Sequence, residues 1–160
     1  MKKIQIIILF ILSLILTGCY HDDYFFDESK LNIVATTSIL GDLVRNIGGD
    51  KVVVYDLMGS GIDPHAYNAT AGDVRKIQKS DLIVYNGLDL EGKMEKVFSN
   101  IDKVGMNYLA IGEHVNTEKL IKTDEFAFDP HIWFDVSIWM EAAEVVKNKL
   151  SQLDEENSIY

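Results

Sequence analysis

Four short apolar stretches alternate along the chain with segments of helical periodicity, and this alternation restricts the fold more than any other feature. The apolar stretches cover residues 31–37, 51–58, 81–87 and 107–112. The segments between them, which repeat apolar residues every three or four positions, cover residues 39–47, 70–80 and 90–101. Strands joined by helices predict a parallel sheet covered on both faces. We therefore expect an α/β fold: a single Rossmann-like lobe over residues 31–160 with a four-stranded parallel sheet.

Residues at the segment ends indicate where the helices begin and stop. Ser38 is the expected cap of the first helix, and the pair Gly48-Gly49 is expected to end it. Thr70 and Asp73 form a variant of the capping box. A long amphipathic helix is predicted over residues 136–153.

The N-terminus reads as an export signal rather than as part of the lobe. Residues 1–18 combine a short cationic start with an apolar run that is too short to span a membrane. The sequence Leu-Thr-Gly-Cys that ends at Cys19 resembles a bacterial lipobox, and Cys19 is the only cysteine of the chain. We expect lipidation at Cys19, a polar tether over residues 19–30, and anchoring at the extracytoplasmic face of the cell membrane.

The only two prolines of the chain lie in the same tripeptide, Asp-Pro-His, which occurs at residues 63–65 and 129–131. Proline restricts its own backbone and the residue before it, so each histidine follows a stiff segment. The two loops follow the second and the fourth predicted strands and therefore lie at the same edge of the sheet. Two imidazoles presented in this way suit a divalent metal ion, so His65 and His131 are the candidate ligands.

Other polar and aromatic residues near these motifs are expected to have structural roles. Asp63 and Asp129 are expected to cap backbone N–H groups; the alternative is that they orient the histidine rings. His114 is expected at the surface. Three aromatic residues lie near the second motif: Trp133, Phe134 and Trp139. They are expected to pack the start of the last helix against the sheet; the alternative is that they line a pocket.

Composition and the absence of other motifs exclude several classes of function. The formal charge of −10 argues against nucleic acid as a partner. The sequence contains no GxGxxG, GxSxG, HExxH or phosphate-loop lysine, so no organic cofactor is expected. A metallohydrolase would need a general base beside the metal, and no motif aims Asp135 or Glu113 at it. We expect no catalytic activity.

Several stretches, taken in order, resemble the metal-receptor lipoproteins of ABC importers, the TroA-like zinc- and manganese-binding proteins. These are the lipobox, "IVATTSILGDLVRNIGGD", "GIDPHAYNATAGDVRKIQKSDLIVYNGLDLE" and "FDPHIWFDV". The resemblance implies two α/β lobes joined by a long helix, with the metal between them. It also implies His65 and His131 as ligands from the N-terminal lobe, zinc or manganese as cargo, and an ABC permease as the partner of a monomeric receptor.

The resemblance also implies a second lobe that supplies two further ligands. The chain stops at "LDEENSIY", where the helix between the lobes would be starting, so we expect an N-terminal lobe only, apparently truncated. The short loop 113–130 lacks a histidine-rich tract, which leans slightly toward the manganese or general transition-metal branch. Two alternatives stay open at this point: a surface lipoprotein or adhesin that acts as an interaction module, and a non-functional fragment of a receptor.

Overall fold

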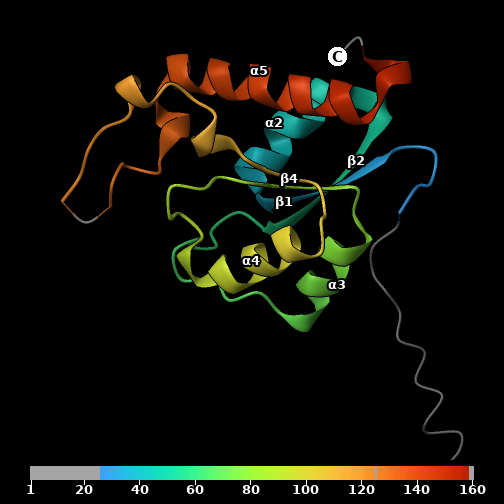
Figure 1. The fold of residues 1–160 in the computed structure, drawn as a ribbon, viewed down its shortest axis with the longest axis horizontal. Coiled ribbons are helices and arrows are strands. Elements are labelled where there is room, and N and C mark those ends of the chain that lie inside the picture. The colour runs from blue at the N-terminus through green and yellow to red at the C-terminus, as the bar shows by residue number, and fades with distance from the viewer. Residues whose placement is uncertain (1–25, 125, 159–160) are drawn as a thin grey trace, which may run out of the picture.

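A parallel sheet lies at the centre of the computed structural model, which describes residues 26–124 and 126–158 (Figure 1). The strands are β1 (Leu31–Thr37), β2 (Val52–Met58), β3 (Leu82–Tyr85) and β4 (Tyr108–Ala110). They are parallel and lie in the order β2-β1-β3-β4, so β2 and β4 form opposite edges. The predicted fold class is confirmed.

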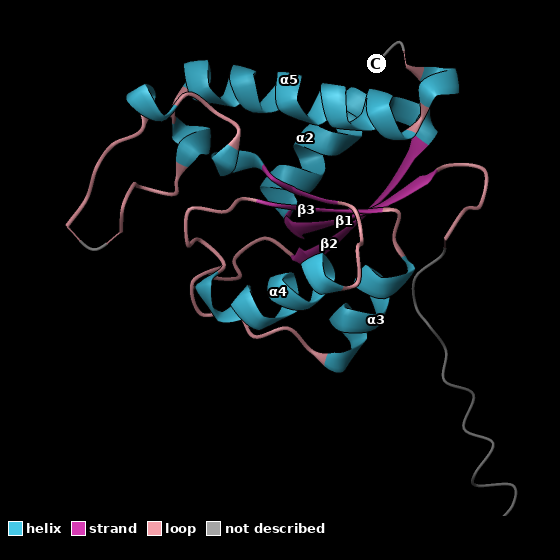
Figure 2. Ribbon diagram, viewed as in Figure 1, coloured by secondary structure: helices cyan, strands magenta, loops and turns pink. Residues whose placement is uncertain are grey.

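In the part of the chain that the structure describes, four α-helices cover the two faces of the sheet (Figure 2). They are α2 (Ser38–Gly48), α3 (Ala71–Lys79), α4 (Glu95–Lys103) and α5 (Val136–Leu153). Helices α2 and α5 lie over one face, and α3 and α4 lie over the other. The last helix has the predicted bounds. The predicted helix over residues 90–101 begins later, because residues 92–94 form a 3-10 turn before α4.

The alternation of side chains across the strands builds two apolar layers. Ile33 and Ala35 of β1 belong to the larger core with α2 and α5, whereas Val34 between them packs in the core with Ile77 of α3 and Ile101 of α4. A strand buried on both faces has no polar alternation. This explains why the strands appear in the sequence as continuous apolar runs.

The caps of two helices position the segments that follow the strands. Thr37, not Ser38, caps α2: its backbone is extended and its hydroxyl accepts a hydrogen bond from the Leu40 N–H at 3.3 Å. Ser38 is already the first helical residue, so the predicted cap was wrong by one position. The predicted capping box of α3 is confirmed, because Thr70 and Asp73 exchange hydrogen bonds.

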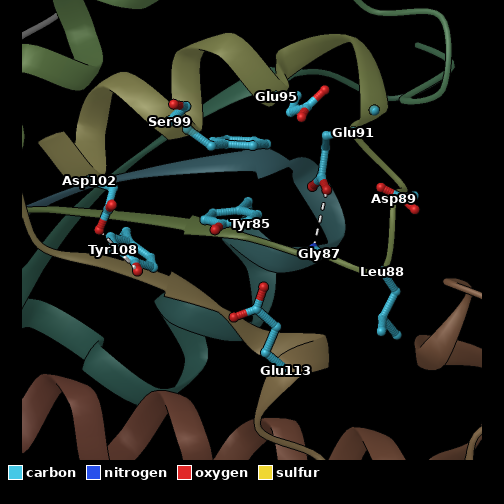
Figure 3. Close-up of a pocket in the computed structure, with 12 residues that line it drawn as sticks. Tyr85, Gly87, Leu88, Asp89, Glu91, Glu95, Ser99, Asp102, Tyr108 and Glu113 are labelled. Carbon is cyan, nitrogen blue, oxygen red and sulfur yellow. Dashed lines mark hydrogen bonds between the residues drawn. The ribbon is translucent and has the colours of Figure 1, made fainter.

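A buried carboxylate joins the carboxyl ends of the two central strands. Glu91 is 2% exposed. It accepts hydrogen bonds from the Thr36 hydroxyl at 2.6 Å and from the Asn86 N–H at 2.9 Å. It also accepts one from the Gly87 N–H at 3.2 Å (Figure 3). Burial raises the pKa of Glu91, and these hydrogen bonds oppose the rise. The Asn86 side chain in turn donates to the Pro130 carbonyl at 2.9 Å, which fastens a distant loop to the sheet.

The predicted signal peptide, Cys19 and most of the tether lie outside the described residues. Residues at the end of the tether contact the lobe: the rings of Phe26 and Tyr55 are 5.2 Å apart, and the Asp27 N–H donates to Asn32. Within the described part of the chain, every helix is too short or too polar to cross a membrane.

We predict that Asp73→Asn destabilises the lobe at neutral pH. Burial alone raises the pKa of Asp73, but hydrogen bonds from Thr70 and Tyr67 outweigh it and lower the pKa below its ordinary value of 3.8. The resulting stability is present above pH 3.8 and is lost as the pH falls through the lower folded-state pKa. Urea unfolding at pH 7 should show a loss of about 1.5–3 kcal/mol that shrinks below pH 3.8.

Asp50→Asn is the matched control for this change. Asp50 is exposed and makes no hydrogen bond within the described residues, and its substitution alters the charge by the same amount. A loss of stability in Asp73→Asn that is equal at all pH values would contradict the prediction.

We also predict that Glu91→Gln destabilises the lobe. The substitution replaces one acceptor oxygen by an amide NH₂, which cannot accept the strand-end N–H bonds. The expected loss in the free energy of unfolding is about 1–3 kcal/mol, measured by urea unfolding at pH 7. Glu95→Gln, at an exposed position on the next helical turn, should leave stability unchanged. Equal effects of the two substitutions would show that the buried hydrogen bonds of Glu91 contribute nothing.

Candidate metal centre

The two Asp-Pro-His loops meet although they leave from opposite edges of the sheet. The loop with His65 follows β2, and the segment with His131 lies between β4 and α5. The Nε2 atoms of the two histidines are 3.4 Å apart, and the ring centroids are 5.4 Å apart. The structure therefore brings together the two candidate ligands that the sequence indicated.

Local hydrogen bonds hold the loop that carries His65. The His65 backbone N–H donates to Asp63 Oδ1 at 2.9 Å. Two residues later, the Tyr67 hydroxyl donates to Asp73 Oδ2 at 2.7 Å, which attaches the loop to the first turn of α3. Burial, followed by the hydrogen bond to Asp73, raises the pKa of Tyr67 to about 12. Tyr67 therefore keeps its proton for this bond at physiological pH.

The segment that carries His131 is held from two sides. The His131 backbone N–H donates to Asp129 Oδ1 at 2.9 Å, and the same oxygen lies 2.7 Å from Nδ1 of the His131 ring. The backbone bond and then the ring bond keep the pKa of Asp129 below its ordinary value. The preceding residue, Pro130, accepts the hydrogen bond from Asn86. Both aspartates thus cap the backbone as expected, and Asp129 also contacts a ring.

The separation of the two Nε2 atoms is compatible with a shared metal ion. It is long for a hydrogen bond, since N–H···O bonds in proteins usually span about 2.7–3.2 Å. Two nitrogens that each bind a tetrahedral ion at about 2.0–2.1 Å lie about 3.3–3.4 Å from each other. The observed 3.4 Å matches the second geometry. The His131 side chain is 39% exposed, so the site is open to solvent.

The described residues supply no further ligand. Within residues 26–124 and 126–158, no group of three or more His, Cys, Asp or Glu side chains is arranged to hold a metal ion. Asp135 caps α5 and accepts from the N–H groups of Ser137 and Ile138. His114 is exposed, as expected. Two imidazoles therefore leave the other coordination positions to water or to groups outside the described residues.

Aromatic rings surround the two histidines. The Phe126 ring lies 6.1 Å from that of His65 at 20°, and the Trp133 ring lies 5.2 Å from that of His131 at 70°. Trp139 packs against the core, as predicted. Phe134 does not: it is 79% exposed, because the turn at residues 132–134 directs Ile132, rather than Phe134, into the core. The packing prediction for Phe134 was wrong; the alternative is confirmed, because Phe134 lines a hollow together with Asp129 and His131.

A hollow lies between α4 and the strands β3 and β4, and no motif in the sequence pointed to it (Figure 3). It has a volume of about 320 Å³. Tyr85 and several carboxylates line it, among them Glu91, Glu95, Asp102 and Glu113. Burial and then the nearby negative charge of Glu113 raise the pKa of Tyr85 to about 12. The only sequence signal for this hollow was the helical spacing of the acidic residues at 91, 95 and 102.

Comparisons with known proteins show which family the chain resembles. The manganese-binding lipoprotein MntA of Bacillus subtilis is 40% identical over 139 residues, which are 86% of this chain and 45% of that protein. The metal ABC transporter substrate-binding lipoprotein SloC of Streptococcus mutans is 34% identical over 167 residues, covering 100% of this chain and 54% of SloC. The chain spans about half the length of the curated relatives it matches.

A solved structure shows the same fold. The periplasmic zinc-binding protein TroA of Treponema pallidum matches with a TM-score of 0.76 and 40% identity, over 81% of this chain and 46% of TroA. The family described as zinc-uptake complex component A, periplasmic, matches residues 33–160. Because this match takes in both Asp-Pro-His loops and most of the sequence, the chain belongs to the family of the periplasmic zinc-uptake complex component A.

Proposed function

We propose that this chain captures a divalent transition metal ion, zinc or manganese, through His65 and His131 and takes part in its delivery to an ABC-type importer. The observation that carries the proposal is the 3.4 Å separation of the two Nε2 atoms at the ends of two stiff loops. The metal is cargo in this proposal, and no catalytic step is involved.

The proposed location and partners follow from the sequence and from the relatives. Cys19 would carry the lipid that anchors the chain at the extracytoplasmic face of the cell membrane, with residues 1–18 removed as a signal peptide. The relatives named as substrate-binding lipoproteins of metal ABC transporters support an ABC permease as the partner of a monomeric receptor. The division into a signal peptide over residues 1–18, a tether over residues 19–30 and an N-terminal lobe over residues 31–160 is part of the same proposal.

The described residues supply two of the ligands that a metal ion needs, so the preference for one metal has to be argued from these two histidines. The names of relatives include both zinc and manganese. Imidazole nitrogen binds most divalent transition metals, so two histidines alone give affinities that follow the general order of the metals. We therefore expect zinc to bind more tightly than manganese to the two histidines by themselves.

We predict that the full chain in detergent micelles binds Zn²⁺ and that the double variant His65→Ala/His131→Ala does not. Each substitution removes one imidazole nitrogen, and the described residues offer no replacement. Competition with a chromogenic zinc chelator gives the two dissociation constants.

His114→Ala is the matched control for this experiment, because it removes an exposed imidazole that lies outside the site. It should leave zinc affinity unchanged. Equal affinity in the double variant would contradict the receptor proposal. It would leave the interpretation as a surface interaction module, which the exposed apolar side chains of Phe134, Val136 and Met140 support.

Metal binding should also stabilise the folded chain. A ligand that binds only the native state at 100 times its dissociation constant adds about 2.7 kcal/mol to the free energy of unfolding. Zinc at this excess should raise the unfolding midpoint in urea, and removal of the metal with a chelator should restore the original midpoint. A midpoint that shifts equally in the double histidine variant would show that zinc binds elsewhere.

A further inference from the structure

We infer that Asp129 is a positioning residue for His131: it accepts the ring Nδ1–H and thereby leaves the lone pair on Nε2, the atom that faces His65. This inference rests on the proposed function of the two histidines as metal ligands. It makes the two imidazoles unequal: Asp129 orients the ring of His131, whereas among the described residues no carboxylate holds the ring of His65.

The geometry around Asp129 carries the inference. A neutral imidazole has one N–H donor and one acceptor nitrogen, whereas an ionised carboxylate only accepts. At 2.7 Å from Asp129 Oδ1, the Nδ1 atom of His131 must therefore be the donor. The remaining nitrogen, Nε2, then carries the lone pair, and it lies 3.4 Å from the Nε2 atom of His65. Hydrogen bonds of this kind fix the tautomer and the ring orientation of metal-binding histidines.

The backbone on both sides of the contact is restrained. The same Asp129 oxygen accepts the His131 backbone N–H at 2.9 Å, so the carboxylate cannot turn away without losing two bonds. Pro130 between the two residues fixes one backbone angle, and its carbonyl is held by the buried Asn86. Both side chains are 39% exposed, so water weakens their electrostatic attraction, and orientation is the effect that remains.

The chain contains its own control for this contact. Asp63-Pro64-His65 has the same three residues, and its aspartate makes the same backbone bond at 2.9 Å. Within the described residues, however, the ring of His65 has no hydrogen bond to a carboxylate, and it lies beside Phe126 instead. A comparison of Asp129→Ala with Asp63→Ala therefore separates the ring contact from the backbone cap.

The first readout is the tautomer of each histidine in the metal-free full chain in detergent micelles. Imidazole ¹⁵N chemical shifts distinguish the Nδ1–H tautomer from the Nε2–H tautomer, and both of these from the doubly protonated ring. We expect His131 to be a single Nδ1–H tautomer in the wild type and in Asp63→Ala. In Asp129→Ala it should become a mixture, and in Asp129→Asn, whose amide oxygen still accepts, it should return toward the Nδ1–H form. A tautomer mixture in the wild type, or a single tautomer in Asp129→Ala, would overturn the inference.

The second readout is zinc affinity, measured by chelator competition. Asp129→Ala should bind zinc about 10–100-fold more weakly than the wild type, with Asp63→Ala closer to the wild type and Asp129→Asn between the two. Equal losses in the two alanine variants would show that only the backbone caps matter. Because the tautomer is read without metal, a wild type that binds no zinc would overturn the proposed function while leaving the tautomer result to decide the role of Asp129.

Discussion

The hydrogen bonds of the buried Glu91 carboxylate are the interaction on which the geometry of the site depends. A buried carboxylate is costly unless its oxygens are satisfied, and here one hydroxyl and two backbone N–H groups satisfy them. These donors come from the end of β1 and from the turn after β3. The bond to the Asn86 backbone fixes the residue whose side chain holds Pro130, so the position of His131 depends on a carboxylate that is far from it in sequence.

The order of the strands explains why such anchoring is needed. The two histidines follow β2 and β4, which lie at opposite edges of the sheet, and long loops must cross the ends of β1 and β3 to bring them together. Long loops lose conformational entropy when they are fixed. Proline beside each histidine, the bond from Tyr67 to Asp73 and the bond from Asn86 to Pro130 all restrict these loops, so less conformational entropy remains to be lost when the two rings are held in place.

The sequence predicted the fold, and it predicted that the two Asp-Pro-His loops lie at the same edge of the sheet, because both predictions depend on local patterns. Continuous apolar strands, helical periodicity and the capping box of Thr70 and Asp73 all act over a few residues. The contacts of individual side chains within these loops could not be predicted from local patterns. Nothing in two identical tripeptides indicates that Asp129 contacts a ring while Asp63 does not, or that Phe134 faces solvent. The choice of Thr37 over Ser38 as a cap depends on where the strand ends, a boundary that patterns locate only to within a few residues.

The unequal support of the two histidines bears on how a metal receptor can both bind and release its cargo. A site in which every ligand is rigid would bind tightly but would exchange its ion slowly. Here Asp129 and Asn86 hold the His131 side, whereas among the described residues the His65 side has a backbone cap and the Phe126 ring beside it. Under the proposed function, His131 would therefore need less ordering than His65 when an ion binds. The His65 ring would then be the ligand that closes on the ion last and opens first.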